Sequence, residues 1–364
     1  MQKYNPYRFI VAKQRRAIKG SDLAKITGLN PKTISRLKTD TDPGKDTIEI
    51  IAKALRYPVE FFYMSNIEVL SEHAVSFRSL SKMTALNRDA AIAAGSLGIL
   101  FWEWVESRFD LPRPDVPDLR YCNPEEAAIA LRQHWKIGQK PIRDIVKLIE
   151  SKGVRVLSLC IDTKQIDAYS FFKNEAPYVF LNNFKTAEHS VFDTAHELGH
   201  LVLHQHSELT LSKQVEAQAN EFAAAFLMPR ADLSAKAPRR ITAGGIIKMK
   251  KRWNVSAMAL THRLKQIGRV SDWQYRSLCI DLSKRGYRTS EPDGIERQKS
   301  VVVQRVLEAL WKERITKKEI ASDLNIPVDE LENLLFKLTH ENSRPERGKT
   351  EGLGVVSSSG EITA

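Results

Sequence analysis

The chain shows helical spacing of apolar residues at both ends and strand-like spacing in a short central stretch. Apolar positions recur three and four residues apart over residues 7–64, which predicts five short helices. Residues 124–160 predict two helices and a first strand, "VRVLSLC", and two more strands follow in "DAYSFFK" and "PYVFLNN". Beyond them the pattern is helical again. We therefore predict a mostly helical α+β protein with one small central sheet.

The patterns divide the 364 residues into five segments. A chain of this length exceeds the usual size of one hydrophobic core. Three prolines in "DLPRPDVPDL" mark a linker, and the Gly- and Ser-rich end without periodicity predicts disorder. The predicted segments are an N-terminal helical bundle at 1–66, a helical connector with its proline-rich linker at 67–120, a central domain at 121–275, a C-terminal helical module at 276–340 and a disordered tail at 341–364.

The first helix after the strands, "FDTAHELGHLVLH", carries residues that can hold a metal ion. His196 and His200 are four residues apart, so a helix places both imidazoles on one face, one turn apart. Glu197 is rotated by about 100° from His196, which suits a group that reaches water on the ion rather than the ion itself. Ser190 and Asp193 have the spacing of a capping box and predict the start of this helix.

A catalytic zinc site needs three protein ligands and an open fourth position, so the two histidines require a third ligand downstream. Glu216 is the best candidate, because "VEAQANEFAAAFLMP" is an amphipathic helix with Glu216 and Asn220 at the edge of its apolar stripe. The alternative is that Glu216 pairs with a surface lysine and the histidines are ordinary core or surface groups.

The N-terminal bundle has the spacing of a helix-turn-helix and an excess of positive charge. Residues 1–64 contain 13 Lys and Arg against 6 Asp and Glu, a net charge of +7 out of +12 for the chain. One helix is followed by a turn centred on Gly28 and a second helix that begins near Pro31, as in a unit that enters the major groove. A bundle that binds only protein remains the alternative.

We expect specific side chains of this bundle to contact DNA. Near base edges or phosphates we expect Lys32, Thr33, Ser35 and Arg36. Neutralisation of the DNA backbone is expected from Lys38, Arg15 and Arg16.

A second helix-turn-helix-like pattern lies at 315–338, but its second helix carries Asp329, Glu330 and Glu332. Because acidic side chains repel phosphate, we interpret it as a packing or partner-binding module.

The remaining composition points to a cytoplasmic protein outside the membrane. Cys122, Cys160 and Cys279 are too few and too far apart for a disulfide framework. The N-terminus has no apolar signal core. The most apolar run starts at Ala90 and carries Glu103 inside it, which is short of a membrane span and predicts a buried helix.

Two families resemble parts of this chain. "FDTAHELGHLVLH" followed by "EAQANEFAAAFLMP" resembles the ImmA/IrrE metallopeptidases, and "PYVFLNN" and "PIRDIVKLIESKGVRVL" extend the resemblance over roughly 125–265. It implies a zincin-like domain in which His196, His200 and Glu216 bind one catalytic zinc ion, with Asn220 beside them. "LAKITGLNPKTISRLK" with "TIEIIAKALRYPVEFF" resembles the XRE class of helix-turn-helix. It departs from that class where "RLKTDTDPGKD" replaces a glutamate and a glycine turn.

The chemistry of such a site is amide hydrolysis. Zinc lowers the pKa of its water to roughly 7, and Glu197 accepts the proton. The strand "YVFLNN" either adds a substrate segment as an extra strand or only packs in the sheet. Tyr169, Tyr178 and His204 are candidates to stabilise the oxyanion. Alternatively, His204 orients a metal ligand through a hydrogen bond, or it only lies at a solvated helix end.

Together the two resemblances imply a DNA-binding regulator with a zinc-dependent, site-specific endopeptidase. Its substrate would be a helix-turn-helix repressor or antitoxin-type partner encoded by a neighbouring gene, and its operator would be double-stranded DNA. By resemblance the chain is expected to bind as a homodimer. The alternative is a repressor or antitoxin that autoregulates its operon and neutralises a toxin, with the metal domain as a non-proteolytic binding platform.

Overall fold

The computed structural model describes residues 3–39, 42–65, 67–70, 84–159, 168–205 and 213–339. The chain divides into two compact units. One comprises residues 1–111, 157–166 and 302–364, and the other comprises 112–156 and 167–301. The tail predicted to be disordered at 341–364 and Cys160 lie outside the described residues.

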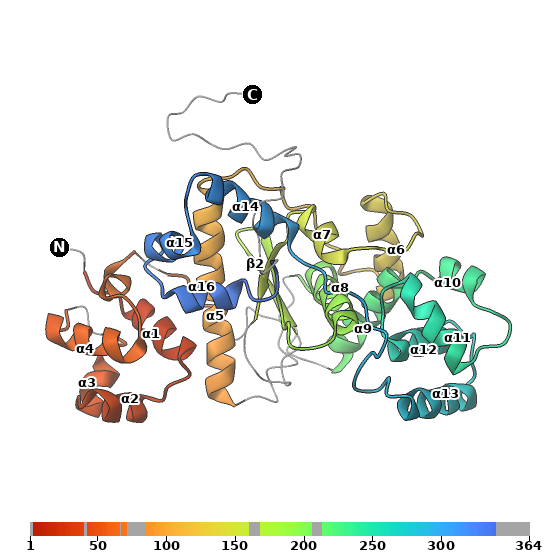
Figure 1. The fold of residues 1–364 in the computed structure, drawn as a ribbon, viewed down its shortest axis with the longest axis horizontal. Coiled ribbons are helices and arrows are strands. Elements are labelled where there is room, and N and C mark those ends of the chain that lie inside the picture. Colours follow the sequence, from red (N-terminus) through yellow and green to blue (C-terminus); the bar gives the residue numbers. More distant parts are fainter. Residues whose placement is uncertain are drawn as a thin grey trace, which may run out of the picture. The chain divides into compact units, whose positions relative to one another are not determined.

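The first unit is almost entirely helical in its described residues, apart from the last two residues of strand β1 (Arg155–Ser158). Its N-terminal part contains four α-helices and a 3-10 helix, which confirms the five short helices predicted from spacing. Asn30 caps the third helix by accepting the N–H of Lys32, and Gly28 supplies the left-handed turn before it at a φ of 71°. The elements (Figure 1) are α1 (Pro6–Arg15), α2 (Gly20–Thr27), α3 (Pro31–Arg36), α4 (Lys45–Leu55), η1 (Val59–Tyr63), α5 (Ala85–Glu106), α14 (Val301–Lys312), α15 (Lys317–Asp323) and α16 (Val328–Leu334).

The apolar run that starts at Ala90 lies in α5, whose central residues are buried. This confirms the predicted buried helix. Among the residues that the structure describes, none of the helices is long and apolar enough to span a membrane.

The C-terminal helices pack onto the N-terminal bundle through buried ion pairs. Glu330 of α16 is fully buried, and its carboxylate accepts hydrogen bonds from Arg15 (2.9 and 2.7 Å) and from the Tyr57 hydroxyl (3.0 Å). Arg16 pairs with Asp329 at 2.6 Å. The predicted packing role of this acidic module is thus confirmed. The prediction that Arg15 and Arg16 neutralise DNA phosphates is wrong, because both guanidinium groups are already paired with carboxylates of α16.

Replacing Glu330 with glutamine should destabilise this unit by about 3 kcal/mol, since it leaves the buried guanidinium of Arg15 without a carboxylate and removes one of the two carboxylates beside Arg16. The exposed Glu332, two residues further on, is the matched control, and its change to glutamine should have almost no effect. Amide hydrogen exchange in α1 measures the difference. Equal protection of α1 in both variants would show that the ion pairs do not hold the C-terminal helices in place.

The second unit holds β2, β3, the first two residues of β1 and the remaining helices. The sheet has the strand order β1-β3-β2, with β2 and β3 antiparallel. The central strand is therefore β3, which contains "YVFL". Because both of its edges already face a strand, the idea that it adds a substrate segment is wrong. The elements are α6 (Pro124–His134), α7 (Ile145–Glu150), β1 (Arg155–Ser158), β2 (Ala168–Lys173), β3 (Ala176–Leu181), α8 (Ala187–Leu203), α9 (Lys213–Leu227), α10 (Arg230–Lys236), α11 (Ala243–Met249), η4 (Lys250–Arg252), α12 (Ala257–Gln266) and α13 (Asp272–Lys284).

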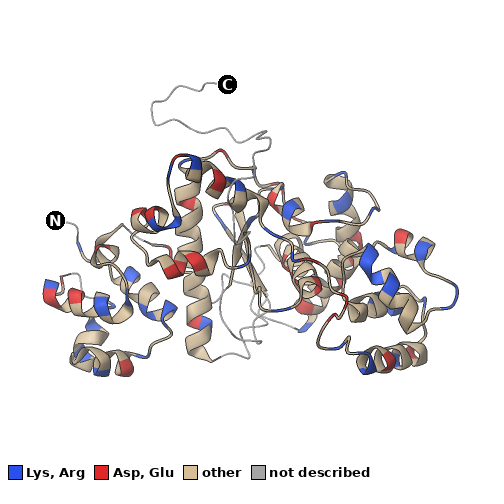
Figure 2. Cartoon of the chain, viewed as in Figure 1, with Lys and Arg blue, Asp and Glu red and all other residues tan. Residues whose placement is uncertain are grey.

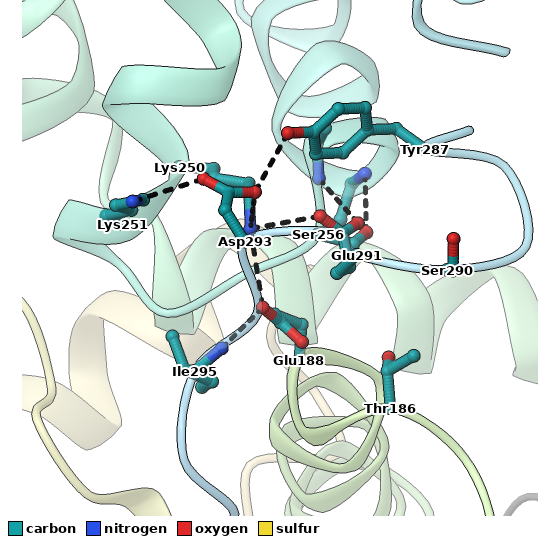
Figure 3. Close-up of polar contacts among 12 residues, drawn as sticks. Thr186, Glu188, Lys250, Lys251, Ser256, Tyr287, Ser290, Glu291, Asp293 and Ile295 are labelled. Atoms are coloured by element: carbon teal, nitrogen blue, oxygen red, sulfur yellow. Dashed lines mark hydrogen bonds and ion pairs between the residues drawn. The ribbon is translucent and has the colours of Figure 1, made fainter. Parts of the chain in front are cut away.

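A buried charge cluster fixes the start of α8 (Figure 3). Lys250 is fully buried, and its Nζ lies 3.3 Å from Glu188, 3.0 Å from Glu291 and 3.5 Å from Asp293. Glu188, in the first turn of α8, also accepts the backbone N–H of Ile295 at 2.9 Å. A buried ammonium is tolerated only when it is paired in this way. The cluster therefore ties the segment after α13 to the helix that carries the histidines.

Candidate metal centre

The helix α8 begins earlier than its sequence indicated. Thr186 caps it, and the Thr186 hydroxyl accepts the N–H of His189 at 3.3 Å. The predicted capping box of Ser190 and Asp193 is wrong, because both residues lie inside the helix. The helix packs against both α9 and the sheet (Figure 1), so its polar face is enclosed by protein.

Gly199 lets α8 and α9 approach closely. A Cβ at this position would lie 2.9 Å from the Phe222 ring and 3.3 Å from the backbone of Ala219. Contacts this short are not tolerated in packed interiors, so a larger residue would push the two helices apart. The close approach brings Glu216, one turn before Asn220 on α9, level with the two histidines.

Three ligand atoms converge between the helices. The Nε2 atoms of His196 and His200 are 3.1 Å apart, and the Glu216 carboxylate lies 3.4 Å from the first and 3.5 Å from the second. Zinc bonds of about 2.0 Å in a tetrahedron place neighbouring ligand atoms about 3.3 Å apart. The two distances to Glu216 involve different oxygens, Oε2 towards His196 and Oε1 towards His200, and each separation is close to this ligand spacing. The donor set, two imidazoles and a carboxylate, is also one that catalytic zinc uses.

Neighbouring side chains determine which ring nitrogen each histidine can offer. The Asn220 oxygen Oδ1 lies 3.1 Å from His196 Nδ1, and an amide oxygen can only accept. His200 Nδ1 lies 3.0 Å from His204 Nδ1, while His204 Nε2 faces the Gln218 oxygen at 3.1 Å. Since Gln218 accepts from Nε2, His204 accepts from His200. When neutral, both rings thus carry their proton on Nδ1 and direct the Nε2 lone pair at the shared centre.

The charges at this centre favour a bound cation. Burial opposes ionisation of Glu216, but hydrogen bonds and charges from His196 and His200 outweigh it and hold its pKa well below the usual range. Burial lowers the pKa of His200 to about 4, so this ring is neutral near pH 7. A neutral imidazole beside a carboxylate is the protonation state in which the group binds a metal.

Glu197 is held by a serine of the sheet. It is buried, and its Oε2 accepts a hydrogen bond of 2.6 Å from the Ser170 hydroxyl on β2. Because Ser170 faces α8, its neighbours along the strand face the opposite side of the sheet. Tyr169 lies on that opposite side, stacked on Phe180, and this removes it as an oxyanion candidate.

The strand register removes a second oxyanion candidate. Tyr178 pairs with Phe171 across the ladder and stacks on its ring. It therefore shares the face of Tyr169, away from α8. Of the three oxyanion candidates, only His204 lies near the centre, where it contacts His200 and Gln218.

The buried carboxyl of Asp193 makes the stability of the second unit depend on pH. Burial raises the pKa of its carboxyl to about 7, although Lys185 opposes this. A carboxyl whose pKa is raised in the folded state costs stability as the pH rises from about 4 to about 7, because the unfolded chain ionises first. Asp193→Asn should therefore raise the free energy of unfolding at pH 8 by up to about 4 kcal/mol, and by little near pH 4.

Urea unfolding of metal-free protein at both pH values measures this difference. Metal-free protein is needed because a bound cation would favour the ionised Asp193. Replacement of the exposed Asp22 by asparagine is the control. A gain for Asp193→Asn that is the same at pH 4 and pH 8 would contradict the account.

The second predicted site, the recognition helix, is largely open to solvent. Lys32, Ser35, Arg36 and Lys38 are exposed, and Thr33 is half-buried. Among the described residues, the three basic side chains form no ion pair with an acidic group. They are available to phosphates in a way that Arg15 and Arg16 are not.

Two residues at the metal centre escape sequence reasoning. Ser170 and Gln218 contact Glu197 and His204 across 27 and 14 residues of chain. The alternating pattern of β2 could have indicated Ser170. This serine is a polar residue at an inward position between two aromatic neighbours. Gln218 lies two residues after Glu216, and no motif marks it.

Comparison with known families gives two matches. Residues 149–265 match the IrrE N-terminal-like domain of the M78 peptidase family. Residues 11–60 match the Cro/C1-type helix-turn-helix DNA-binding domain. The first match contains the three candidate ligand residues, and the second contains the helix predicted to contact DNA. The curated proteins contain no match to the chain.

Proposed function

Because the chain joins a Cro/C1-type helix-turn-helix DNA-binding domain to an IrrE N-terminal-like domain of the M78 peptidase family, we propose that it is a DNA-binding regulator with a zinc-dependent endopeptidase site. Its proposed substrate is a helix-turn-helix repressor or antitoxin-type protein encoded by a neighbouring gene. The observation that carries the proposal is the convergence of His196, His200 and Glu216 on one centre, with their ligand atoms within 4.8 Å of one another.

The residues present fit zinc, and each has a defined part. His196, His200 and Glu216 hold the ion, which when bound supplies Lewis acidity to water and to a substrate carbonyl. Glu197 accepts the proton of the attacking water and returns it to the leaving amine. Asn220 and His204 keep the two imidazoles in the tautomer that ligates.

Ser170 is proposed as the positioning residue of Glu197. Its hydroxyl fixes one carboxylate oxygen and stabilises the ionised form, so Ser170→Ala should reduce kcat about 10-fold and shift the acidic limb of the pH–kcat profile to higher pH. Zinc content should not change. Ser158→Ala, which alters a buried hydroxyl of β1, is the control. A loss of activity with an unshifted pH profile would mean that Ser170 is only structural.

In the proposed regulator, the recognition helix binds operator DNA with Lys32, Arg36 and Lys38 at the interface. The class of domain implies a dimer on two half-sites. Arg36→Ala should weaken binding to the operator by about 1–3 kcal/mol. The cleavage of a purified protein substrate should be unaffected, since the peptidase site lies in the other unit.

The test of the proposal is cleavage in cells. The chain is co-expressed with each protein encoded by the adjacent genes, as wild type, as Glu197→Gln and as Arg36→Ala. Cleavage of one partner that persists in Arg36→Ala and disappears in Glu197→Gln supports the peptidase. If all partners stay intact and only Arg36→Ala changes promoter activity, the chain is instead an autoregulating repressor or antitoxin whose metal domain is a binding platform.

A further inference from the structure

One segment of the second unit carries as much net positive charge as the whole chain. Residues 236–290 contain 14 Lys and Arg but only two acidic residues, a net charge of +12, which equals the formal net charge of the protein. The segment runs from the end of α10 through α13, and Figure 2 shows Lys and Arg prevailing over that part of the ribbon. Where such an excess is not paired internally, it raises the local concentration of anionic partners.

Internal pairing accounts for fewer than half of these cations. Six form ion pairs, among them the buried Lys250 with its carboxylates and Arg263 with Glu125. The other eight are exposed, and none pairs with an acidic side chain in the described parts of the chain. Six of these eight, which we call the basic surface, lie at the end of α10, on the loop after it, on the loop before α13 and on α13 itself. They are Lys236, Arg239, Arg240, Arg269, Arg276 and Lys284.

Hydrogen bonds hold the two loops of the basic surface together. The guanidinium of Arg269 donates to the carbonyl oxygens of Ala237 and Pro238 at 3.1 and 3.2 Å. Arg269 directly precedes the start of α13, which Ser271 caps. The loop with Arg239 and Arg240 therefore lies next to the N-terminal end of α13.

The exposed face of α13 adds large apolar side chains to this charge. Trp273 is 77% exposed and Ile280 is 57% exposed, and helical spacing puts them on the same face as Arg276 and Lys284. Exposed apolar side chains that are grouped and rimmed by polar ones are a feature of interaction sites. The combination indicates a surface that is covered by a partner.

We infer that the basic surface binds the phosphate backbone of duplex DNA, as a second contact besides the recognition helix. Four of its six cations are arginines, whose planar guanidinium groups donate two parallel hydrogen bonds to a phosphate. The match of residues 11–60 to a DNA-binding domain makes duplex DNA a polyanion that this protein is expected to encounter. The inference rests on DNA binding by that domain and is independent of the peptidase.

The experiment compares the salt dependence of binding to a duplex of unrelated sequence, measured by fluorescence anisotropy on the full chain. The test variant is Arg239→Gln/Arg240→Gln/Arg276→Gln. The matched control, Lys312→Gln/Lys317→Gln/Lys318→Gln, removes three exposed charges from the first unit. Loss of three phosphate contacts should reduce the slope of log K against log salt by about 2.7 in the test variant and leave it almost unchanged in the control.

Both variants are repeated in an Arg36→Ala/Lys38→Ala background, which separates this surface from the recognition helix. Residual duplex binding should survive in that background and fall at least tenfold when the three arginines are also replaced. An unchanged slope in the test variant overturns the inference, and so does an equal decrease in the control, which would report net charge alone. Loss of binding to polyglutamate with intact duplex binding also overturns it and identifies an acidic protein as the partner.

Discussion

Replacing Glu197 with glutamine should reduce peptide cleavage by about 1000-fold or more while zinc stays bound. Glutamine has almost the same shape and still accepts a hydrogen bond from Ser170, but it cannot take a proton from water at neutral pH. Transfer of that proton by a positioned carboxylate contributes roughly 100- to 10,000-fold to the rate. The variant protein should be folded, because the polar contact of the side chain is kept.

Single-turnover cleavage of the partner protein, with zinc content measured on the same samples, checks this result. Glu221→Gln, an exposed residue of α9, is the matched control and should cleave like the wild type. If Glu197→Gln retains more than a tenth of the activity, another group must activate the water and the assignment of Glu197 is wrong.

Replacing Glu216 with alanine should weaken zinc binding by at least about 1000-fold. Changes to residues that hydrogen-bond to the ligands typically reduce metal affinity 10- to 100-fold, and removal of a direct ligand reduces it further. The Glu216 carboxylate is also the negative charge that faces both imidazoles, so without it the site loses its charge complementarity to a dication. Cleavage should be lost together with the metal.

A competition assay with a zinc chelator tests this prediction by ranking the zinc affinities of three variants. Glu216→Ala should bind most weakly, and Asn220→Ala should lose about 10- to 100-fold because its oxygen only orients His196. Glu221→Ala should bind like the wild type. An affinity of Glu216→Ala equal to that of Asn220→Ala would mean that Glu216 is not a ligand.

The metal centre was accessible from the sequence because its signals are local. His196 and His200 lie one turn apart on one helix, and Glu216 and Asn220 repeat that spacing on the next. Periodicity places such residues on helix faces without knowledge of the fold. The structure adds the close approach at Gly199, which brings the two faces to one centre.

What the sequence could not provide depends on pairing between distant parts of the chain. Strand order is not encoded in the strands themselves, so the sequence left open whether β3 is an available edge or packs inside the sheet. Arg15 and Arg16 looked like DNA contacts because their partners, Glu330 and Asp329, lie more than 300 residues away. The contact of Ser170 with Glu197 depends equally on how the strand packs against the helix.

The most direct test of the central claim is X-ray absorption at the zinc edge on the purified chain. The account predicts one zinc ion per chain with a shell of nitrogen and oxygen at about 2.0 Å, the scattering pattern of two imidazoles, and loss of this signal in Glu216→Ala. A shell of sulfur at about 2.3 Å, or a zinc signal that Glu216→Ala leaves unchanged, would contradict it.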